Sequence, residues 1–495
     1  MLNSMRVLVP ISILAGAALP IAFAPHHCVP LAILSPAILL WIWQKTTAKE
    51  ALMTGFGYGL GVFGMGVSWV YVSIHDFGNT DIPLAVLITS LLVIMLALFF
   101  AVQGYVLSRL YRTDTVLFSL LRFPSAWVLF EWVRSWLFTG FPWLYLGYSQ
   151  LGSPLSAYAP IASVYGVSFA VVLTSGTLVT LCKGNSNAKI LATIMVALLW
   201  GGGFLGQERA YTTLEPHPYT VSLIQGNIKP FDKFTQAEPI RSTEQTYGRL
   251  SEKEWGRDLI LWPESAIPLA LPYAEDYVQH LQNVAAAHHS TLITGIQVVK
   301  SNGMAYNALI ALGNGEGLYH KYHLLPFGDF LPFEKWLRGL INFFDLPNSS
   351  FSNGDEDQPL ISAGTLKLDP LICYEIAFPE LVRKTLRNAD AIITLSEDGW
   401  FGKSWGPHQH LQIAQMRALE TGRYVLRATT SGITAIIDPK GNIAATIPAF
   451  EAMVLRGAFY SMKGNTPWVE MGLWPLLILL LVCLVIPIRP LSRRS

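Results

Sequence analysis

Eight long apolar stretches constrain this chain more than any other feature of its sequence. A helix that crosses a bilayer needs about 20 mostly apolar residues. Seven such stretches precede residue 207, near residues 6–24, 28–43, 52–74, 83–108, 115–137, 160–181 and 188–206, and an eighth covers about 468–488. The second is short, and Glu131 and Arg134 interrupt the fifth. The sequence therefore predicts a polytopic α-helical membrane domain with about eight spans.

Charged residues are unevenly distributed along the chain. They make up 14% of the 495 residues, against about 25% in a typical soluble domain. Most of them lie in residues 207–466, so we expect three parts: a membrane domain with seven spans (1–206), a domain of soluble composition (207–466), and a last span with a basic tail (467–495). No basic block of the kind that binds nucleic acid is present.

The basic residues of the short loops predict the orientation of the spans. Lys and Arg are enriched in cytoplasmic loops. With seven spans before the large domain, all the basic loops fall on one side of the membrane. Both termini are then cytoplasmic and residues 207–466 lie outside. In a bacterium this corresponds to a multi-pass protein of the inner membrane, with its large domain in the periplasm.

Strand-like and helix-like runs alternate within residues 207–466. We expect strands at 219–228, 258–265, 291–299, 305–313, 389–397 and 432–443, and helices at 238–254, 275–289 and 407–421. Such a mixture indicates an α/β sandwich, and "IIDPKGNI" predicts an antiparallel hairpin. The polar segment 345–360 is a candidate mobile loop.

Cys373 is the one cysteine of this domain, so it has no disulfide partner there. A lone thiol in an oxidising compartment is either buried or chemically used. "LKLDPLIC" reads as a strand and "FPELVRKTL" as a helix, which places Cys373 at the turn between them. The nearby helix N-terminus predicts that the thiolate is favoured.

A thiol that attacks a carbonyl carbon needs a base and a group that stabilises the oxyanion. Glu264 ends the apolar run "LILWPESA", and Lys321 precedes a loop rich in Pro and Gly in "GLYHKYHLLPFGDFLP". Either residue alone is more often structural than functional. Together, Glu264, Lys321 and Cys373 follow the order Glu, Lys, Cys, which resembles the triad of the nitrilase superfamily.

The whole chain resembles the apolipoprotein N-acyltransferase family, the membrane branch of the nitrilase or carbon–nitrogen hydrolase superfamily. "FEWVRSWLFTGFPWLYLGYSQ" (130–150) and "WFGKSWGPHQHLQIAQMRALETGRYVLRATTSGITAIID" (400–438) are similar to its signatures. The resemblance implies a nitrilase-like αββα sandwich. It also implies acyl transfer from a membrane phospholipid, through a cysteine thioester, to the N-terminal amine of a diacylglyceryl-cysteine apolipoprotein, without a metal or organic cofactor.

The resemblance also assigns roles to residues. Glu264 is the expected general base, Lys321 stabilises the oxyanion together with a backbone N–H near Tyr374, and Cys373 is the nucleophile. Further residues are expected to support the site or to bind substrate: Asp329, where the family usually has Glu, Tyr374, Glu375, Phe234 and Trp400. Glu397 and Gly399 also depart from the family's pattern, where Asn and Ala are usual.

Three alternatives to an N-acyltransferase remain open from the sequence. A membrane-anchored amidase would use the same triad with water as acceptor. A divergent paralogue would use another acyl donor or acceptor, and a lipid-binding protein would keep the fold without catalysis. His408 and His410, two residues apart on a predicted helix, face different directions, so we do not expect them to share a metal ion.

Overall fold

The computed structural model describes residues 2–111, 113, 115–229, 239–332, 334, 350–386 and 388–486. The chain forms two compact units. The first consists of Met1–Gly66, Leu91–Arg209 and Met471–Ser495, and the second of Val67–Ser90 and Ala210–Glu470. The second unit therefore contains a segment that lies more than a hundred residues before the rest of its chain.

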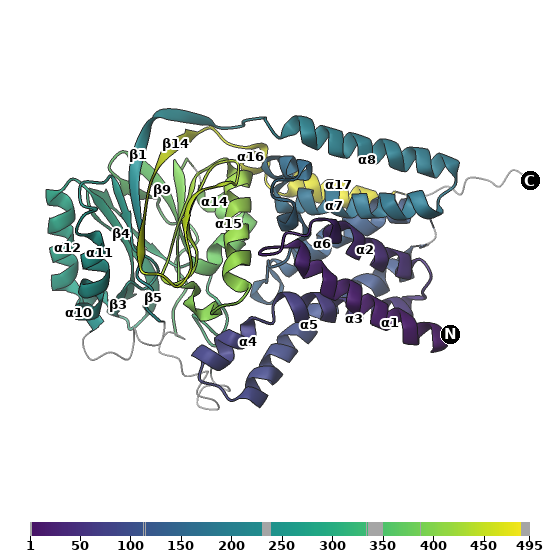
Figure 1. Cartoon of the computed structure of the whole chain (residues 1–495), viewed down its shortest axis with the longest axis horizontal. Helices are drawn as coiled ribbons and strands as arrows, with labels where there is room; N and C mark the ends of the chain where they lie inside the picture. The colour runs from purple at the N-terminus through teal and green to yellow at the C-terminus, as the bar shows by residue number, and fades with distance from the viewer. Residues whose placement is uncertain are drawn as a thin grey trace, which may run out of the picture. The chain divides into compact units, whose positions relative to one another are not determined.

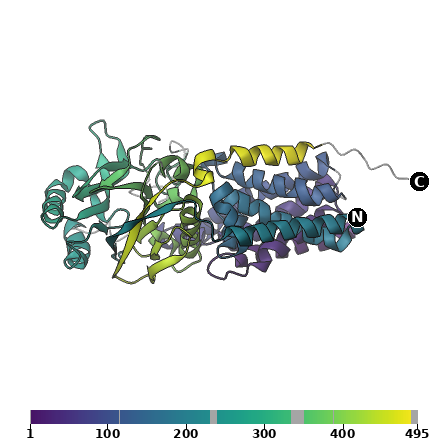
Figure 2. The same cartoon turned by 90° about the horizontal axis from the view of Figure 1, so that it is seen from above.

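The first unit is helical, and its helices run beside one another (Figure 2). Its helices are α1 (Leu2–Ala18), α2 (Pro30–Trp43), α3 (Ala48–Gly66), most of α5 (Ile82–Leu110), α6 (Phe123–Arg134), α7 (Ala159–Lys183), α8 (Ser186–Gly206) and α17 (Trp474–Val485).

Helices occupy all eight apolar stretches, but not all of these helices are long enough to cross a membrane. Four described helical stretches have the length and apolar character of a span: Met5–Ala22, Ile82–Leu110, Pro154–Lys183 and Ser186–Gly206. A fifth results if the bent pair Ala48–Gly66 and Val70–Phe77 is one span. Pro30–Trp43 and Trp474–Val485 are apolar but shorter.

Glycines allow α3 to pack closely on both of its neighbours. A Cβ added at Gly61 would lie 2.2 Å from the carbonyl oxygen of Ile13 on α1, and one added at Gly59 would lie 2.6 Å from the Cα of Ala97 on α5. Helix backbones approach this closely only where a side chain is missing. The glycines of α3 therefore permit its close packing on α1 and α5.

Glu131 and Arg134, the charges that interrupt the fifth stretch, both bind the segment that follows α6. Glu131 accepts a hydrogen bond from the backbone N–H of Leu146 at 2.8 Å, and Arg134 donates to the carbonyl oxygen of Trp143 at 2.6 Å. Buried charges are stable when their hydrogen-bonding capacity is used. These two side chains thus fix part of the connection between α6 and α7.

The second unit contains two seven-stranded sheets. The first has the order β14-β1-β2-β4-β5-β7, with β3 beside β4, and the second the order β13-β12-β11-β10-β9-β8-β6. The strands of the first sheet are β1 (Thr213–Gln225), β2 (Leu259–Leu261), β3 (Ile267–Ala270), β4 (Thr291–Val299), β5 (Ala305–Gly313), β7 (Leu318–His320) and β14 (Met453–Lys463). Those of the second are β6 (Gly315–Glu316), β8 (Ile361–Ala363), β9 (Leu366–Ile372), β10 (Ala391–Ser396), β11 (Val425–Thr429), β12 (Thr434–Ile437) and β13 (Ile443–Ile447).

The main core lies between the two sheets. Successive side chains of a strand point to opposite faces, and β2 shows the result. Leu259 and Leu261 pack with Leu368 and Ile393 of the second sheet, whereas Ile260 packs on the other face with the residues around Leu281. Both faces of the first sheet are therefore buried, which explains the continuous apolar runs of its strands.

Helices cover the outer faces of the sandwich (Figure 1). α10 (Pro239–Thr243), α11 (Arg249–Ser251) and α12 (Glu275–Ala287) lie along the first sheet, and α14 (Pro379–Leu386) and α15 (Gly406–Thr421) along the second. The arrangement is an αββα sandwich, as expected. The predicted hairpin is also present, because β12 and β13 pair antiparallel. The long edge strand β14, which pairs antiparallel with β1, is not predicted from the sequence.

Candidate active site

The carboxyl ends of adjacent parallel strands converge at the site. β10 pairs in parallel with both β9 and β11, with Leu395 opposite Ile372 and Ser396 opposite Thr429. Cys373 and Glu397 each follow directly after the last residue of their strand. The predicted position of Cys373 at the end of a strand is confirmed.

The turn at Cys373 has an unusual backbone. Cys373 has φ +54°, in the left-handed region that residues with a side chain rarely adopt. It begins a short 3₁₀ helix, Cys373–Ala377. Strain of this kind costs on the order of 1–3 kcal/mol and persists only where the surroundings hold the residue in place.

Lys321 reaches the site from the first sheet, directly after β7. Its ammonium nitrogen lies 2.7 Å from Oδ2 of Asp329 and 3.5 Å from Oε1 of Glu264, and its side chain is 2% exposed. Burial alone would lower the pKa of Lys321, but the two carboxylates outweigh it and raise the pKa well above its ordinary value. Lys321 therefore remains an ammonium ion.

Asp329 is one methylene shorter than the family's usual Glu, yet it contacts Lys321 directly. The same oxygen, Oδ2, accepts a hydrogen bond of 2.7 Å from the backbone N–H of Leu325. The loop from Leu325 to Asp329 thus folds back on itself and brings the shorter side chain to the lysine.

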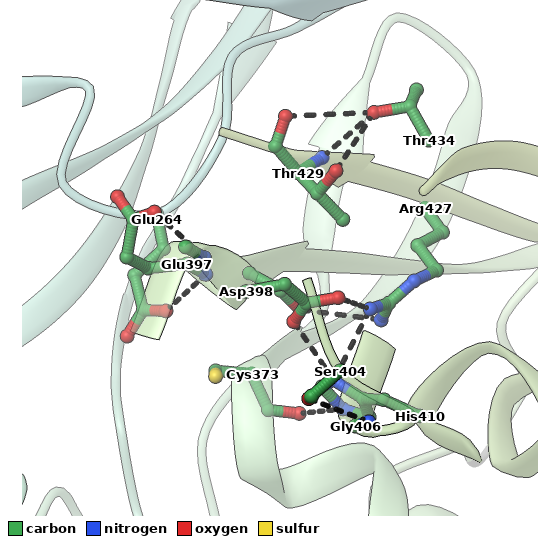
Figure 3. Close-up of polar contacts among 12 residues, drawn as sticks. Glu264, Cys373, Glu397, Asp398, Ser404, Gly406, His410, Arg427, Thr429 and Thr434 are labelled. Carbon is green, nitrogen blue, oxygen red and sulfur yellow. Dashed lines mark hydrogen bonds and ion pairs between the residues drawn. The ribbon is translucent and has the colours of Figure 1, made fainter. Parts of the chain in front are cut away.

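Glu264 lies just beyond the end of β2 and is 6% exposed. Its Oε1 accepts from Nδ2 of Asn307 at 2.8 Å, and its Oε2 accepts from the backbone N–H of Glu397 at 2.8 Å (Figure 3). The carboxylate is therefore fixed from both sheets. The carboxylate of Glu397, which stands where the family usually has Asn, accepts a hydrogen bond from the backbone N–H of Gly399.

The thiol of Cys373 is held in the neutral form. Burial raises its pKa well above the ordinary value, the Glu264 carboxylate adds to this, and Lys321 opposes it. The helix α14 begins at Pro379, as expected, but the prediction that its N-terminus favours the thiolate is wrong, because desolvation of the thiol dominates. The nucleophile consequently needs a base, and Glu264 is a carboxylate close to both Lys321 and the thiol.

Glu375 joins the lysine-bearing and cysteine-bearing segments. Its Oε1 accepts from the backbone N–H groups of Tyr322 and His323 and from the hydroxyl of Tyr319, and its Oε2 accepts from the backbone N–H of Ile372. Burial raises the pKa of Glu375 to about 7, although these hydrogen bonds oppose the shift. The carboxyl group fixes the positions of the residues that precede Cys373 and follow Lys321.

The remaining expected residues lie in different surroundings. Tyr374 is buried, and its ring packs edge-to-face against Phe378 at 5.0 Å between centroids. Trp400 packs edge-to-face against Phe77 at 6.0 Å, and its carbonyl accepts from the hydroxyl of Ser73. Phe234 and residues 345–349 of the predicted mobile loop lie outside the described residues. The part of that loop around Gly354 is tied to the site by a hydrogen bond of 2.8 Å from its N–H to the Lys321 carbonyl.

Sequence reasoning missed several polar residues that surround the site. Asn307 on β5 binds Glu264, and Asp398, His410 and Arg427 form a buried cluster beside Cys373. Nothing distinguishes Asn307 in the sequence. The motif 400–438 does contain a signal for two of them, because Arg427 lies in an apolar run that reads as a buried strand. A buried Arg needs a charged or polar partner, and His410 lies in the same motif. Among the described residues, no group of three or more His, Cys, Asp or Glu side chains could hold a metal ion.

Comparison with known proteins covers both halves of the chain. Residues 15–177 match the family described as "Apolipoprotein N-acyltransferase N-terminal domain", and residues 220–459 match "Carbon-nitrogen hydrolase". Proteins named apolipoprotein N-acyltransferase from Azotobacter vinelandii and Coxiella burnetii are each 41% identical to it, over 94% and 96% of this chain and 92% and 99% of theirs. The chain belongs to the apolipoprotein N-acyltransferase family.

Solved structures are similar to about half of this family member. A CN-hydrolase superfamily protein from Xanthomonas campestris is 17% identical, with a TM-score of 0.38, and the match covers 53% of this chain and 97% of that one. An amidase from Nesterenkonia sp. is 19% identical, with a TM-score of 0.36, over 52% of this chain and 94% of that one.

Proposed function

We propose that this protein transfers an acyl chain from a membrane phospholipid to the N-terminal amine of a diacylglyceryl-cysteine apolipoprotein, through a thioester on Cys373. One observation carries the proposal. A neutral cysteine thiol lies beside a buried ammonium and carboxylate, in a chain that is about 40% identical over nearly its whole length to proteins named for this activity.

The first half-reaction acylates Cys373. Glu264 accepts the thiol proton as the sulfur attacks the ester carbonyl carbon of the phospholipid. The carbon–oxygen bond of the ester breaks, and the lysophospholipid leaves with a proton returned by Glu264. Lys321 and the backbone N–H of Tyr374 stabilise the negative oxygen of the tetrahedral intermediate, and Asp329 holds the lysine in place.

The second half-reaction transfers the acyl chain to nitrogen. The lipoprotein's α-amine attacks the thioester carbon, Glu264 takes up a proton from the amine, and the carbon–sulfur bond breaks as Glu264 returns that proton to the departing sulfur. The products are an amide and the free thiol, so the enzyme returns to its starting state without a metal or cofactor. Trp400, Tyr374 and Phe234 supply apolar surface for the acyl chains.

The membrane arrangement suits substrates whose acyl chains remain in the bilayer. Eight helical spans, seven within 1–206 and one within 467–495, would hold the chain in the bacterial inner membrane with both termini in the cytoplasm. Residues 207–466 would form the catalytic domain in the periplasm. The short helices α2 and α17 would cross the membrane where the bilayer is locally thinner.

A membrane-anchored amidase is less well supported. It would account for the match at residues 220–459 but not for the match of residues 15–177 to an N-acyltransferase domain. An amidase with a water-soluble substrate also has no need of several apolar helices.

Mass spectrometry of the intact protein tests the proposal. Incubation with phosphatidylethanolamine vesicles should add the mass of one acyl chain, which hydroxylamine removes and which Cys373→Ala does not acquire. A diacylated lipopeptide should then discharge the thioester and gain that acyl chain. Discharge by water alone would indicate a hydrolase, and a free thiol after incubation with several phospholipids would contradict acyl transfer.

A further inference from the structure

A buried charged cluster lies beside Cys373, on the side of its carbonyl oxygen (Figure 3). Arg427 comes from β11, Asp398 follows β10, and His410 lies on α15. Arg427 and Asp398 are 0% exposed and His410 is 1% exposed. Buried ion pairs contribute little to stability compared with apolar residues of the same volume. Their presence beside the nucleophile therefore calls for another explanation.

The contacts within the cluster form a chain that ends at the nucleophile. Arg427 pairs with Oδ2 of Asp398, and Oδ1 of Asp398 lies 2.9 Å from Nδ1 of His410. On the other side of the ring, Nε2 lies 3.2 Å from the carbonyl oxygen of Cys373 (Figure 3).

Polar groups on both sides of the ring hold it in place. Because the Cys373 carbonyl can only accept, Nε2–H donates to it. Nδ1 faces a donor, Nη2 of Arg427 at 3.1 Å, as well as the acceptor Asp398. Burial and Arg427 lower the pKa of His410, whereas Asp398 opposes them. Nε2 thus donates to the Cys373 carbonyl, and Nδ1 lies between Oδ1 of Asp398 and Nη2 of Arg427, which together hold the ring in this orientation.

This hydrogen bond acts on the peptide group that joins Cys373 to Tyr374. The carbonyl oxygen and the N–H of one trans peptide point in opposite directions. A donor that binds the Cys373 oxygen therefore fixes where the Tyr374 N–H points and, by polarising the peptide, makes that N–H a stronger donor. In Figure 3 the carbonyl points toward His410 and the sulfur lies on the other side of the residue.

We propose that His410, oriented by Asp398 and Arg427, is a positioning residue that holds the strained Cys373–Tyr374 peptide so that its N–H can stabilise the oxyanion. The proposal deepens the proposed acyl transfer and rests on it for the role of Cys373. His410 does not touch the substrate. It acts through the backbone of the nucleophile.

The test compares two reactions of Cys373 in the full-length protein. Acylation by p-nitrophenyl octanoate passes through an oxyanion: the sulfur bonds to the carbonyl carbon, and p-nitrophenol leaves. Alkylation by iodoacetamide uses the same thiol and base, expels iodide, and forms no oxyanion. The activated ester acylates Cys373 whether or not a phospholipid is the natural donor, so it tests the role of His410. The vesicle experiment tests the proposed function, and the two proposals can therefore fail separately.

His410→Leu should lower the acylation rate constant by roughly 10- to 100-fold, somewhat less than the loss of a direct oxyanion donor. Its KM for the ester and its alkylation rate should change less than about threefold, since neither depends on that donor. His410→Gln, whose amide can still donate to the Cys373 carbonyl, should recover part of the acylation rate.

Asp390→Asn is the matched control. Asp390 is 3% exposed, accepts from Ser461 and Lys463, and precedes β10, whereas Asp398 follows it. The substitution Asp390→Asn therefore disturbs a buried polar cluster at the opposite end of β10 from Cys373. The acylation rate of this variant should equal that of the wild type. Unchanged acylation in His410→Leu, an equal loss in both reactions, or an equal loss in Asp390→Asn would overturn the proposal.

Discussion

At the scale of single residues, Glu375 makes the free energy of unfolding depend on pH. Its pKa is raised by burial from an ordinary 4.5 to about 7. Between these values the folded protein keeps a proton that the unfolded chain has lost. The free energy of unfolding that depends on this group is thus fully present below about pH 4.5, and is lost as the pH rises through about 7.

Glu375→Gln should remove this dependence, because an amide does not titrate. We expect the wild type to lose on the order of 3 kcal/mol between pH 4.5 and 7 through this group, and the variant to lose none of it. At pH 4.5 the variant should also be less stable than the wild type, since its amide nitrogen cannot accept the N–H of Ile372. Denaturant unfolding in detergent between pH 4.5 and 8 measures both effects.

Glu254→Gln is a control with the opposite sign. Arg456 and Ser222 hydrogen-bond the Glu254 carboxylate and lower its pKa. Its contribution to stability is therefore lost as the pH falls, not as it rises. Equal slopes between pH 4.5 and 7 in the wild type and Glu375→Gln would show that Glu375 does not hold its proton there.

The residues of the site differ in how far the sequence could predict them. Glu264, Lys321 and Cys373 follow a recognisable order, and the structure brings Lys321 within 3.5 Å of Glu264. For His410 the sequence predicts only that it shares no metal ion with His408, and it indicates no other role. The contact of His410 with Cys373 depends on the packing of α15 against the turns that follow β9 and β10, and no local spacing in the sequence records such packing.

At the scale of elements, one glycine permits the geometry of Glu264. Gly295 lies in β4, and a Cβ there would be 2.4 Å from the backbone nitrogen of Ser265 and 2.8 Å from the Cα of Glu264. Ser265 itself has φ +51°. The turn that carries the base is therefore pressed directly against the neighbouring strand.

Gly295→Ala should displace Glu264 and slow thioester formation by roughly 10- to 100-fold, because a shift of about 1 Å in a catalytic group has effects of this size. The overpacking should cost about 1–3 kcal/mol of stability. Gly248→Ala, where the nearest side-chain atom lies 3.7 Å away, is the matched control and should change neither quantity appreciably. Thioester formation and unfolding of both variants, measured side by side, check this, and wild-type rates in Gly295→Ala would contradict it.

Apolar runs predicted most strands of the sandwich because the two sheets bury strands on both faces. The sequence does not predict β14, because this strand has no continuous apolar run. Exposed residues such as Met453 and Arg456 alternate irregularly with buried ones along its length. Its place beside β1 follows from a pairing of distant segments, with Leu223 opposite Leu455. Such a pairing has no signature within the strand.

At the scale of the whole molecule, the sheet-containing unit is not continuous in sequence. Val67–Ser90 belongs to it, although hydropathy alone assigns this segment to the apolar N-terminal part of the chain. The indole N–H of Trp69 donates to the side chain of Gln409 on α15 at 3.0 Å, and the hydroxyl of Ser73 donates to the carbonyl of Trp400 at 2.8 Å. These contacts support the two elements that present His410 and Asp398 to the nucleophile.

A fragment of residues 210–470 should consequently be a weaker enzyme than the same fragment joined to residues 67–90. Without the segment, α15 and the turn at Trp400 lose hydrogen bonds and the aromatic contact between Trp69 and Phe401, whose ring centroids are 4.6 Å apart. We expect Cys373 of the short fragment to react with p-nitrophenyl octanoate at least about tenfold more slowly, and the melting temperature of this fragment to be lower.

Joining residues 67–90 ahead of residue 210 by a flexible Gly/Ser linker should restore most of the reaction rate and of the melting temperature, because the linker makes the docking intramolecular. A Trp69→Ala, Ser73→Ala form of the joined fragment separates docking from mere extra length, and it should behave like the short fragment. If the short fragment already matched the joined one, residues 67–90 would serve only to connect helices, and the site would be complete within residues 210–470.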